Sequence, residues 1–160
     1  MSSCGGKVIA NFENEEVNKL VKKHFGQFTK NADFYNSSSF NHILKRVLRE
    51  TVITGDCVLV FDDKLVEDSG KILFFEAEEI VGTTNEAIEK HYGKGAYQSQ
   101  GKVYNKNGRW IGTVVSRACR GSDNADPSKC WFLKRNPNGS YLDNYWFQVE
   151  NSWRDGRGVS

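Results

Sequence analysis

The fold is decided by residues 39–61, which read SFNHILKRVLRETVITGDCVLVF. Apolar side chains recur in the first part of this stretch at steps of three and four residues, the spacing of one side of an α-helix. They are Phe40, Ile43, Leu44, Val47, Leu48, Thr51 and Val52. The serines at 37–39 can cap this helix and Gly55 can stop it. The apolar run 56–61 then predicts a buried strand entered through a Gly55-Asp56 turn.

A second amphipathic helix is predicted ahead of this stretch. Its apolar positions follow the same spacing and are Val17, Leu20, Val21, His24, Phe25 and Phe28. Asn14 is a suitable cap, and Glu15 and Glu16 fall in the first turn, where free backbone N–H groups favour negative charge. Because His24 lies within the apolar stripe, we expect a partly buried structural histidine and not a ligand.

Two further elements are predicted after the strand at 56–61. Residues 71–77 (KILFFEA) form a mostly apolar run that can pair with that strand as a hairpin with a longer loop. Residues 84–91 predict one short helix.

A tight hairpin is predicted next. It joins residues 102–104 to residues 109–115 across Asn107 and Gly108, with Arg109 directly after the turn. Asn-Gly is the strongest short-range hairpin signal because both residues tolerate a positive φ.

A second hairpin is predicted near the end of the chain. It joins residues 130–133 to residues 141–149 through a turn that contains Asn138 and Gly139. Residues 121–128 between the two hairpins predict a polar, mobile loop.

These elements predict an α+β fold, with two N-terminal amphipathic helices packed on a mostly antiparallel sheet built from hairpins. A length of 160 residues suits a single domain over 1–160 with one core. We expect the segments 1–10 and 151–160 to be extended or flexible, and the glycine-interrupted end to mark a fragment of a longer protein.

The composition is that of a globular, soluble protein. Hydrophobic residues make up 38% of the chain and charged residues 26%, and no apolar run approaches the roughly 20 residues of a membrane-spanning helix. Cys4, Cys57, Cys119 and Cys130 are widely spaced, which indicates free thiols and no zinc site. Whether Cys119 and Cys130 pair across the loop between them is left open, since sequence cannot establish the geometry.

No catalytic signature is present, so we expect no enzyme, no catalytic residue, no metal and no cofactor. The strings HExxH, GxSxG, GxGxxG and GxxxxGK[ST] are all missing. Glu76, Glu78 and Glu79, together with Asp62 and Asp63, could gather around a divalent cation in a metal-dependent nuclease. Solvated loop charge is the favoured interpretation, because no Lys or His accompanies them at a nuclease-like spacing.

A nucleic-acid-binding module is the stronger alternative. The net charge is only +2, but residues 81–160 carry 12 basic and 7 acidic side chains. The strands of this half combine the aromatics Tyr97, Tyr104, Trp110, Trp131, Phe132, Tyr141, Tyr145 and Trp146 with the cations Lys102, Lys106, Arg109, Arg117, Arg120, Lys134 and Arg135. Aromatic faces stack bases and cations bind phosphate. Aromatic residues in strands more often pack against one another, which is the favoured interpretation.

Three segments, in order, resemble a known family. The helix and Gly-Asp turn of residues 39–61 are similar to a helix that runs into a "GD" turn and an apolar strand. Residues 100–110 (QGKVYNKNGRW) are similar to a "GIxYDxxGRxxAY" hairpin, and residues 153–160 (WRDGRGVS) to an "RxGQxRGVS" segment. The family is that of the portal proteins of tailed bacteriophages, in particular the lambda-like group.

The resemblance covers most of residues 39–160 and has two departures. Asp155-Gly156-Arg157 replaces the usual Gly-Gln-x-Arg, and Gly112-Thr113 stands where an Ala-Tyr pair is typical. Portal proteins are several hundred residues long, so the resemblance implies a fragment: a wing-like region without the helices that line the DNA channel.

The resemblance also implies a role. Portal subunits form a ring of about twelve copies, which meet through heterologous interfaces that close by rotation. The ring sits at one vertex of the virion after assembly in the host cytoplasm, binds terminase and head-completion proteins, passes DNA and involves no membrane. Arg154, Gly156, Arg157 and Gly158 are the candidate hinge or subunit contact. A plain flexible C-terminus is the alternative there.

Overall fold

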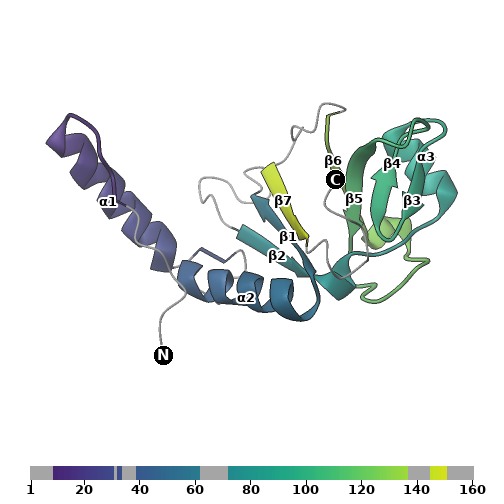
Figure 1. The fold of residues 1–160 in the computed structure, drawn as a ribbon, viewed down its shortest axis with the longest axis horizontal. Helices are drawn as coiled ribbons and strands as arrows, with labels where there is room; N and C mark the ends of the chain where they lie inside the picture. Colours follow the sequence, from purple (N-terminus) through teal and green to yellow (C-terminus); the bar gives the residue numbers. More distant parts are fainter. Residues whose placement is uncertain (1–8, 31, 34–38, 62–71, 137–144, 151–160) are drawn as a thin grey trace.

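The computed structural model describes residues 9–30, 32–33, 39–61, 72–136 and 145–150, and its fold is α+β as predicted (Figure 1). The helices are α1 (Glu15–Lys30), α2 (Phe40–Ile53) and α3 (Asn85–Tyr92), with short 3-10 helices η1 (Ala77–Glu79) and η2 (Pro127–Lys129). The strands are β1 (Asp56–Phe61), β2 (Ile72–Glu76), β3 (Tyr97–Ser99), β4 (Lys102–Tyr104), β5 (Trp110–Val115), β6 (Trp131–Lys134) and β7 (Tyr145–Glu150).

The strands form two antiparallel sheets, with the orders β2-β1-β7 and β3-β4-β5-β6. The predicted pairing of β1 with β2 is confirmed, with Val60 opposite Leu73. The predicted second hairpin is wrong. β6 pairs with β5, whereas β7 pairs with β1 in the other sheet, with Leu59 opposite Phe147. The predicted turn residues of this hairpin, Asn138 and Gly139, lie outside the described residues.

A shared hydrophobic core holds the two sheets together and explains where β7 goes. Val58, Val60, Leu73, Phe75 and Trp146 from the first sheet pack with Val115 and Leu133 from the second. Trp146 is fully buried, and its indole N–H donates a hydrogen bond of 3.1 Å to the carbonyl oxygen of Lys134 at the end of β6. A large aromatic side chain of β7 thus fills the space between the sheets.

The Gly55-Asp56 turn lies where the sequence predicts it. Ser39 caps α2 by accepting a hydrogen bond from the His42 N–H, and Gly55 adopts a φ of 81° just after the last turn. The Gly55 N–H donates to the Glu50 carbonyl, closing the helix. α2 packs on the three-stranded sheet, where Ile43 lies in a cluster with Ile72.

The predicted β4–β5 turn is also present. Gly108 has a φ of 80°, and its N–H donates to the Asn105 carbonyl. The side-chain oxygen of Asn105 accepts hydrogen bonds from the N–H groups of Asn107 (3.0 Å) and Arg109 (2.9 Å). Asn105 therefore organises the turn, and Gly108 supplies the one positive φ that it needs.

The polar segment 121–128 is hydrogen-bonded to residues 78–83. Ala125 is buried, and its carbonyl accepts a hydrogen bond of 2.7 Å from the Thr83 hydroxyl. The Gly121 N–H donates to the Glu78 carbonyl, which ties the segment to η1.

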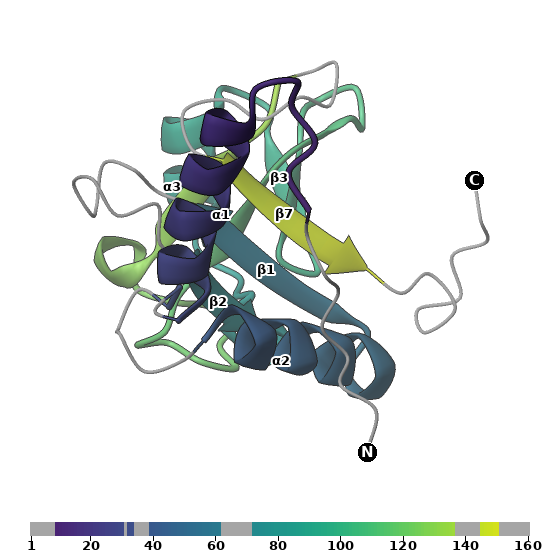
Figure 2. The ribbon, with the colours of Figure 1, turned by 90° about the vertical axis from the view of Figure 1, so that its left-hand side faces the viewer.

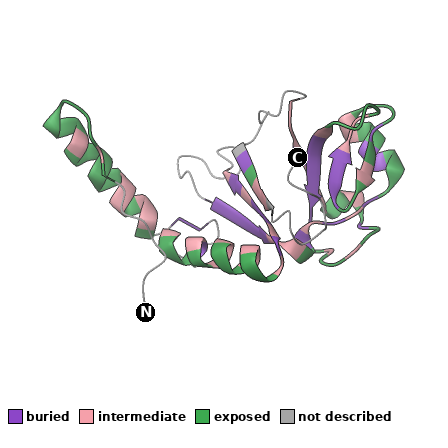
Figure 3. Ribbon diagram, viewed as in Figure 1, coloured by how far each residue is buried: buried purple, intermediate pink, exposed green. Residues whose placement is uncertain are grey.

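Helix α1 is present as predicted, but its apolar stripe is not buried. No residue of α1 is buried. The helix packs on α2 through Phe40, whose ring centroid lies 6.1 Å from that of Phe25 and 5.7 Å from that of Phe28. Figure 1 shows α1 projecting beyond the sheets, Figure 2 shows it in front of them from the side on which it projects, and Figure 3 shows its surface as exposed or half-buried. His24, expected to be partly buried, is exposed for the same reason.

Candidate functional site

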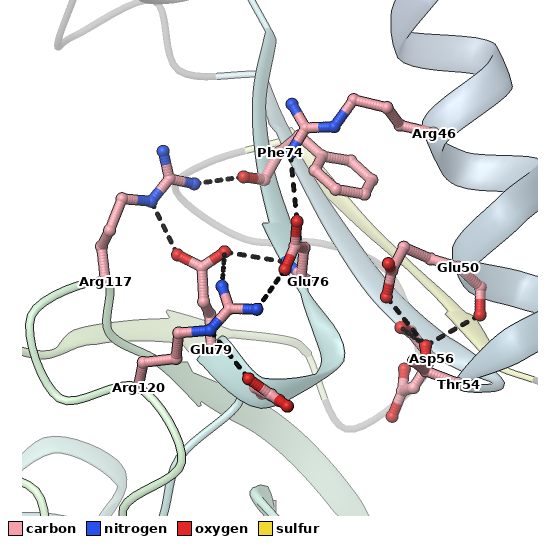
Figure 4. Close-up of polar contacts among 10 residues, drawn as sticks. Arg46, Glu50, Thr54, Asp56, Phe74, Glu76, Glu79, Arg117 and Arg120 are labelled. Atoms are coloured by element: carbon pink, nitrogen blue, oxygen red, sulfur yellow. Dashed lines mark hydrogen bonds and ion pairs between the residues drawn. The ribbon is translucent and has the colours of Figure 1, made fainter.

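A cluster of paired charged side chains lies where β2 runs into η1 (Figure 4). We call it the arginine–glutamate junction, and it consists of Arg46, Glu76, Glu78, Glu79, Arg117 and Arg120. The glutamates come from the end of β2 and from η1. One arginine comes from α2 and two come from the segment after β5, so the junction connects three parts of the chain that are distant in sequence.

Glu79 is the buried centre of the junction, with a side chain only 5% exposed. Its carboxylate accepts hydrogen bonds from the Glu76 backbone N–H at 3.1 Å and from Arg117 Nε at 2.7 Å. Arg120 Nη1 lies 3.5 Å from the same carboxylate. Arg117 also donates to the Phe74 carbonyl and lies 4.8 Å from the centre of the Phe75 ring.

Arg120 connects the remaining carboxylates. Its guanidinium donates to Glu78 at 2.8 Å and to Glu76. Arg46 of α2 approaches the other oxygen of Glu76 at 3.4 Å and covers the Phe74 ring. Three glutamates thus face three arginines, and the local formal charge is balanced.

This pairing decides what the junction can do chemically. The Arg120 guanidinium, and then Arg46, hold the pKa of Glu76 below its usual value of 4.5. Such a carboxylate stays ionised near neutral pH and is a poor general base, while an arginine does not give up its proton. In the part of the chain that the structure describes, no group of three or more His, Cys, Asp or Glu residues could hold a metal ion.

The junction therefore corrects the interpretation of these glutamates as solvated loop charge. Glu78 is mostly exposed, but Glu79 is buried and paired with two arginines about 40 residues further along the chain. Asp62 and Asp63, the other members of the predicted acidic group, lie outside the described residues. Sequence spacing contains no signal for the pairing, because the arginines reach η1 only through the fold.

A loss of the Glu79 charge is expected to destabilise the fold. Glu79→Gln should lower the free energy of unfolding by about 2 kcal/mol, less than a fully buried pair would lose, because Arg117 and Arg120 are nearly half-exposed. Urea unfolding followed by tryptophan fluorescence measures the change. The neighbouring Glu78→Gln is the matched control and should change stability by less than about 0.5 kcal/mol, since Glu78 is 66% exposed. Equal losses in both variants would contradict the central role of Glu79.

Stability should also depend on pH through Glu76. Its pKa is lowered in the folded state, so the unfolded chain takes up its proton first as the pH falls. The stabilisation is complete above the unfolded value near 4.5 and is lost as the pH falls through the lower folded value. In Arg120→Gln, the free energy of unfolding should fall less steeply as the pH is lowered below 4.5. Arg49→Gln, on the exposed side of α2, should leave this dependence of the free energy of unfolding on pH unchanged.

The cysteines of the described segments are thiols and not disulfides. They are Cys57, Cys119 and Cys130. Burial raises the pKa of Cys57 to about 12 and also raises that of Cys130. Both groups are therefore neutral near pH 7, unlike a nucleophilic thiolate.

Most of the strand aromatics considered for base stacking pack against other side chains of the same chain. The Arg135 guanidinium carbon lies 3.7 Å from the centre of the Trp110 ring, and Lys102 Nζ lies 5.1 Å from the same centre. Phe132 stacks on His91 at 3.7 Å. Trp131 meets Phe75 edge-on, and Trp146 is buried. Tyr97 is 45% exposed and stacks on Tyr104, while Tyr141 lies outside the described residues.

A polar recess lies beside η1, and one of its lining side chains is hydrogen-bonded within the chain. Its lining includes Gln98, whose amide donates to the carbonyls of Val81 (2.7 Å) and Gly101 (3.0 Å). The Gln98 side-chain oxygen accepts from the Thr83 N–H at 2.9 Å. These bonds position the loops of the second sheet and leave the Gln98 amide little capacity for a ligand.

The candidate hinge residues Arg154, Gly156, Arg157 and Gly158 lie outside the described residues. Compared with known proteins, the chain matches no family model. No curated protein is significantly similar to it in sequence. Among the described helices, none is both long enough and apolar enough to cross a membrane.

Proposed function

We propose that this chain is part of a portal protein of a tailed bacteriophage and acts as a non-catalytic structural component of the portal vertex. The resemblance of three ordered segments is the starting point. Two of them fall on defining positions of the fold: the Gly55-Asp56 turn leads from α2 into β1, the central strand of its sheet, and Asn107-Gly108 forms the β4–β5 turn. The third segment, 153–160, lies outside the described residues.

The observation that carries the proposal is the uncovered apolar side of α1. Val17, Leu20 and Val21 are 38%, 55% and 37% exposed on a helix that projects from the body (Figure 3). Exposed apolar side chains that share one side of a helix favour a protein contact there, because leaving them in water is unfavourable. A subunit of a larger assembly can bury such a surface against a neighbouring protein.

The balanced junction supports a structural role over a metal-dependent nuclease. A nuclease needs carboxylates free to bind a cation, whereas Glu76, Glu78 and Glu79 are held by arginines. The proposal extends to what the resemblance implies: a ring of about twelve subunits that contact terminase and head-completion proteins around a DNA channel, in the virion and, during assembly, in the host cytoplasm.

Gene order tests the proposal directly. We expect a gene for the large terminase subunit immediately upstream, and a gene for a head-maturation protease or capsid protein downstream. A position among unrelated metabolic or regulatory genes would contradict the proposal.

A salt-dependent gel shift tests the rival function of nucleic-acid binding. We expect the 160-residue chain to bind short single- and double-stranded DNA weakly, because the strand aromatics pack within the fold. A Kd below about 1 μM near physiological salt, with a slope that reports several phosphate contacts, would favour the rival.

A further inference from the structure

Two cysteines lie on either side of the polar segment 121–128. Cys119 precedes this segment and Cys130 follows it, and both are half-buried thiols. Both side chains pack against the same hydrophobic cluster of the second sheet, whose fully buried members include Ile88 and Val114. The two thiols therefore reach one region of the core from the two ends of a single loop.

The buried side chain of Ser116 joins the two ends of this loop. Its hydroxyl accepts a hydrogen bond of 3.1 Å from the Cys119 N–H and donates one of 2.7 Å to the carbonyl of Lys129, the residue directly before Cys130. Burial, and then the Cys119 thiol, raise the pKa of the Cys130 thiol, while Ser116 lowers it. Because an electrostatic effect between two thiols acts only over a short range, Cys119 and Cys130 are neighbours in space.

Hydrogen bonds already hold the loop closed. The Ala125 N–H donates to the Gly82 carbonyl at 2.7 Å, and the Thr83 hydroxyl donates to the Ala125 carbonyl at the same distance. The Cys130 thiol donates to the Asp126 carbonyl at 3.2 Å. Most of the chain entropy of closing this loop is therefore lost on folding, and a bond between the two sulfur atoms adds little to that loss.

We propose that Cys119 and Cys130 form a reversible disulfide when the folded protein meets a disulfide oxidant such as oxidised glutathione. The Cys119 thiolate attacks one sulfur atom of the oxidant, which gives a mixed disulfide and releases one reduced glutathione. The Cys130 sulfur then displaces the second glutathione and forms the bond between the two Sγ atoms. Two electrons pass from the cysteines to the oxidant, and their two protons leave with the two reduced glutathione molecules.

The order of the two steps follows from the surroundings of Cys130. Burial raises the pKa of its thiol, and the Asp126 carbonyl accepts its S–H hydrogen bond, so both effects disfavour the thiolate that a first attack needs. Cys119 is therefore the attacking residue and Cys130 the resolving one.

The disulfide would fasten one part of the arginine–glutamate junction. Arg120, directly after Cys119, donates to Glu76 and Glu78. A bond to Cys130 ties this part of the chain covalently to the other end of the loop. A cross-linked loop has fewer conformations to lose on folding, so the oxidised protein should be the more stable form and the loop should open less often.

Peptide mass spectrometry tests the pairing. The 160-residue chain with Cys4→Ser, which retains only Cys57, Cys119 and Cys130, is incubated in the folded state with glutathione buffers of rising oxidised fraction. Free thiols are then blocked before digestion. We expect a linked peptide pair that joins Cys119 to Cys130 and disappears on treatment with dithiothreitol. A link through Cys57, or no link at any glutathione ratio, would overturn the proposal.

Moving one thiol by a single residue is the matched control. Ala118 is exposed, whereas Cys119 packs on the hydrophobic cluster. Ala118→Cys combined with Cys119→Ser should therefore link to Cys130 at least about tenfold less at the same glutathione ratio. Equal linkage from position 118 would show that closeness in sequence is sufficient, and it would refute a pairing built into the folded arrangement.

Urea unfolding of the reduced and the oxidised protein is the second test. We expect the oxidised form to have the higher urea midpoint, and the equilibrium with glutathione to favour the disulfide at least about tenfold more in the folded chain than in urea. Trypsin cleavage after Arg120 and Lys129 should slow at least about fivefold on oxidation and recover with dithiothreitol. A lower midpoint in the oxidised form, or a disulfide that forms only in urea, would contradict the proposal.

Discussion

Replacement of Trp146 by alanine is expected to lower the free energy of unfolding by about 4 kcal/mol, within the range for truncating a buried aromatic side chain. Trp146 is fully buried in the core that joins the two sheets, where its ring meets Trp110 edge-on at 6.1 Å. The substitution removes this apolar contact and leaves a cavity. It also leaves the Lys134 carbonyl without the indole donor at 3.1 Å.

Urea unfolding followed by circular dichroism measures this change without depending on the removed fluorophore. The adjacent residue supplies the control: Phe147 is 47% exposed on the other face of β7, so Phe147→Ala should cost about 1 kcal/mol or less. Because the sheets share one core, we expect a single transition in wild-type protein. A Trp146→Ala loss below about 1 kcal/mol would show that the sheets do not depend on this side chain.

Local patterns predicted the elements well, for reasons that the structure makes plain. The apolar spacing in 40–52, the glycine with positive φ at 55 and the Asn-Gly turn at 107–108 each act within a few residues. Such signals are complete within the sequence window that contains them. The cap of α3 is equally local, although it was not predicted: Thr84 accepts a hydrogen bond from the Ala87 N–H.

Long-range pairing was not predictable in the same way. The apolar alternation of residues 145–150 indicates a strand but not its partner, and a nearby Asn-Gly turn suggested β6. The correct partner, β1, lies about 90 residues earlier and is selected by burial of Trp146 between the sheets. The ion pairs of the junction were not predicted for the same reason, because nothing near Arg117 in sequence identifies Glu79 as its partner.

The exposure of α1 shows a different limit. Its apolar stripe predicted a helix correctly and also suggested burial, but amphipathic spacing says only that one side avoids water. It does not say whether the covering surface belongs to the same chain. In this structure the described part of the chain covers only the Phe25 and Phe28 end of the stripe, by Phe40 of α2.

The second large effect is expected from adding one methyl group at Gly112, a departure from the Ala that the portal pattern has at this place. A Cβ atom there would lie 2.3 Å from the Leu133 carbonyl oxygen and 2.3 Å from the Tyr92 ring. Neither can move freely: Leu133 is paired in β6, and the Tyr92 hydroxyl donates to the Leu133 carbonyl at 2.8 Å. Gly112→Ala should therefore lower the free energy of unfolding by about 3 kcal/mol, the upper range for overpacking.

The control for Gly112→Ala is the same chemical change where space is free. A Cβ atom at Gly26 in α1 would meet nothing within 4 Å, so Gly26→Ala should be neutral or raise stability by up to about 1 kcal/mol through its helix propensity. Urea midpoints of both variants give the comparison. If Gly112→Ala proved as stable as wild type, the packing of Tyr92 across β5 would be wrong. The double variant Gly112→Ala, Tyr92→Leu separates the two contacts: if the Tyr92 ring is the main obstacle, its replacement relieves most of the added strain, whereas a clash with the Leu133 backbone persists.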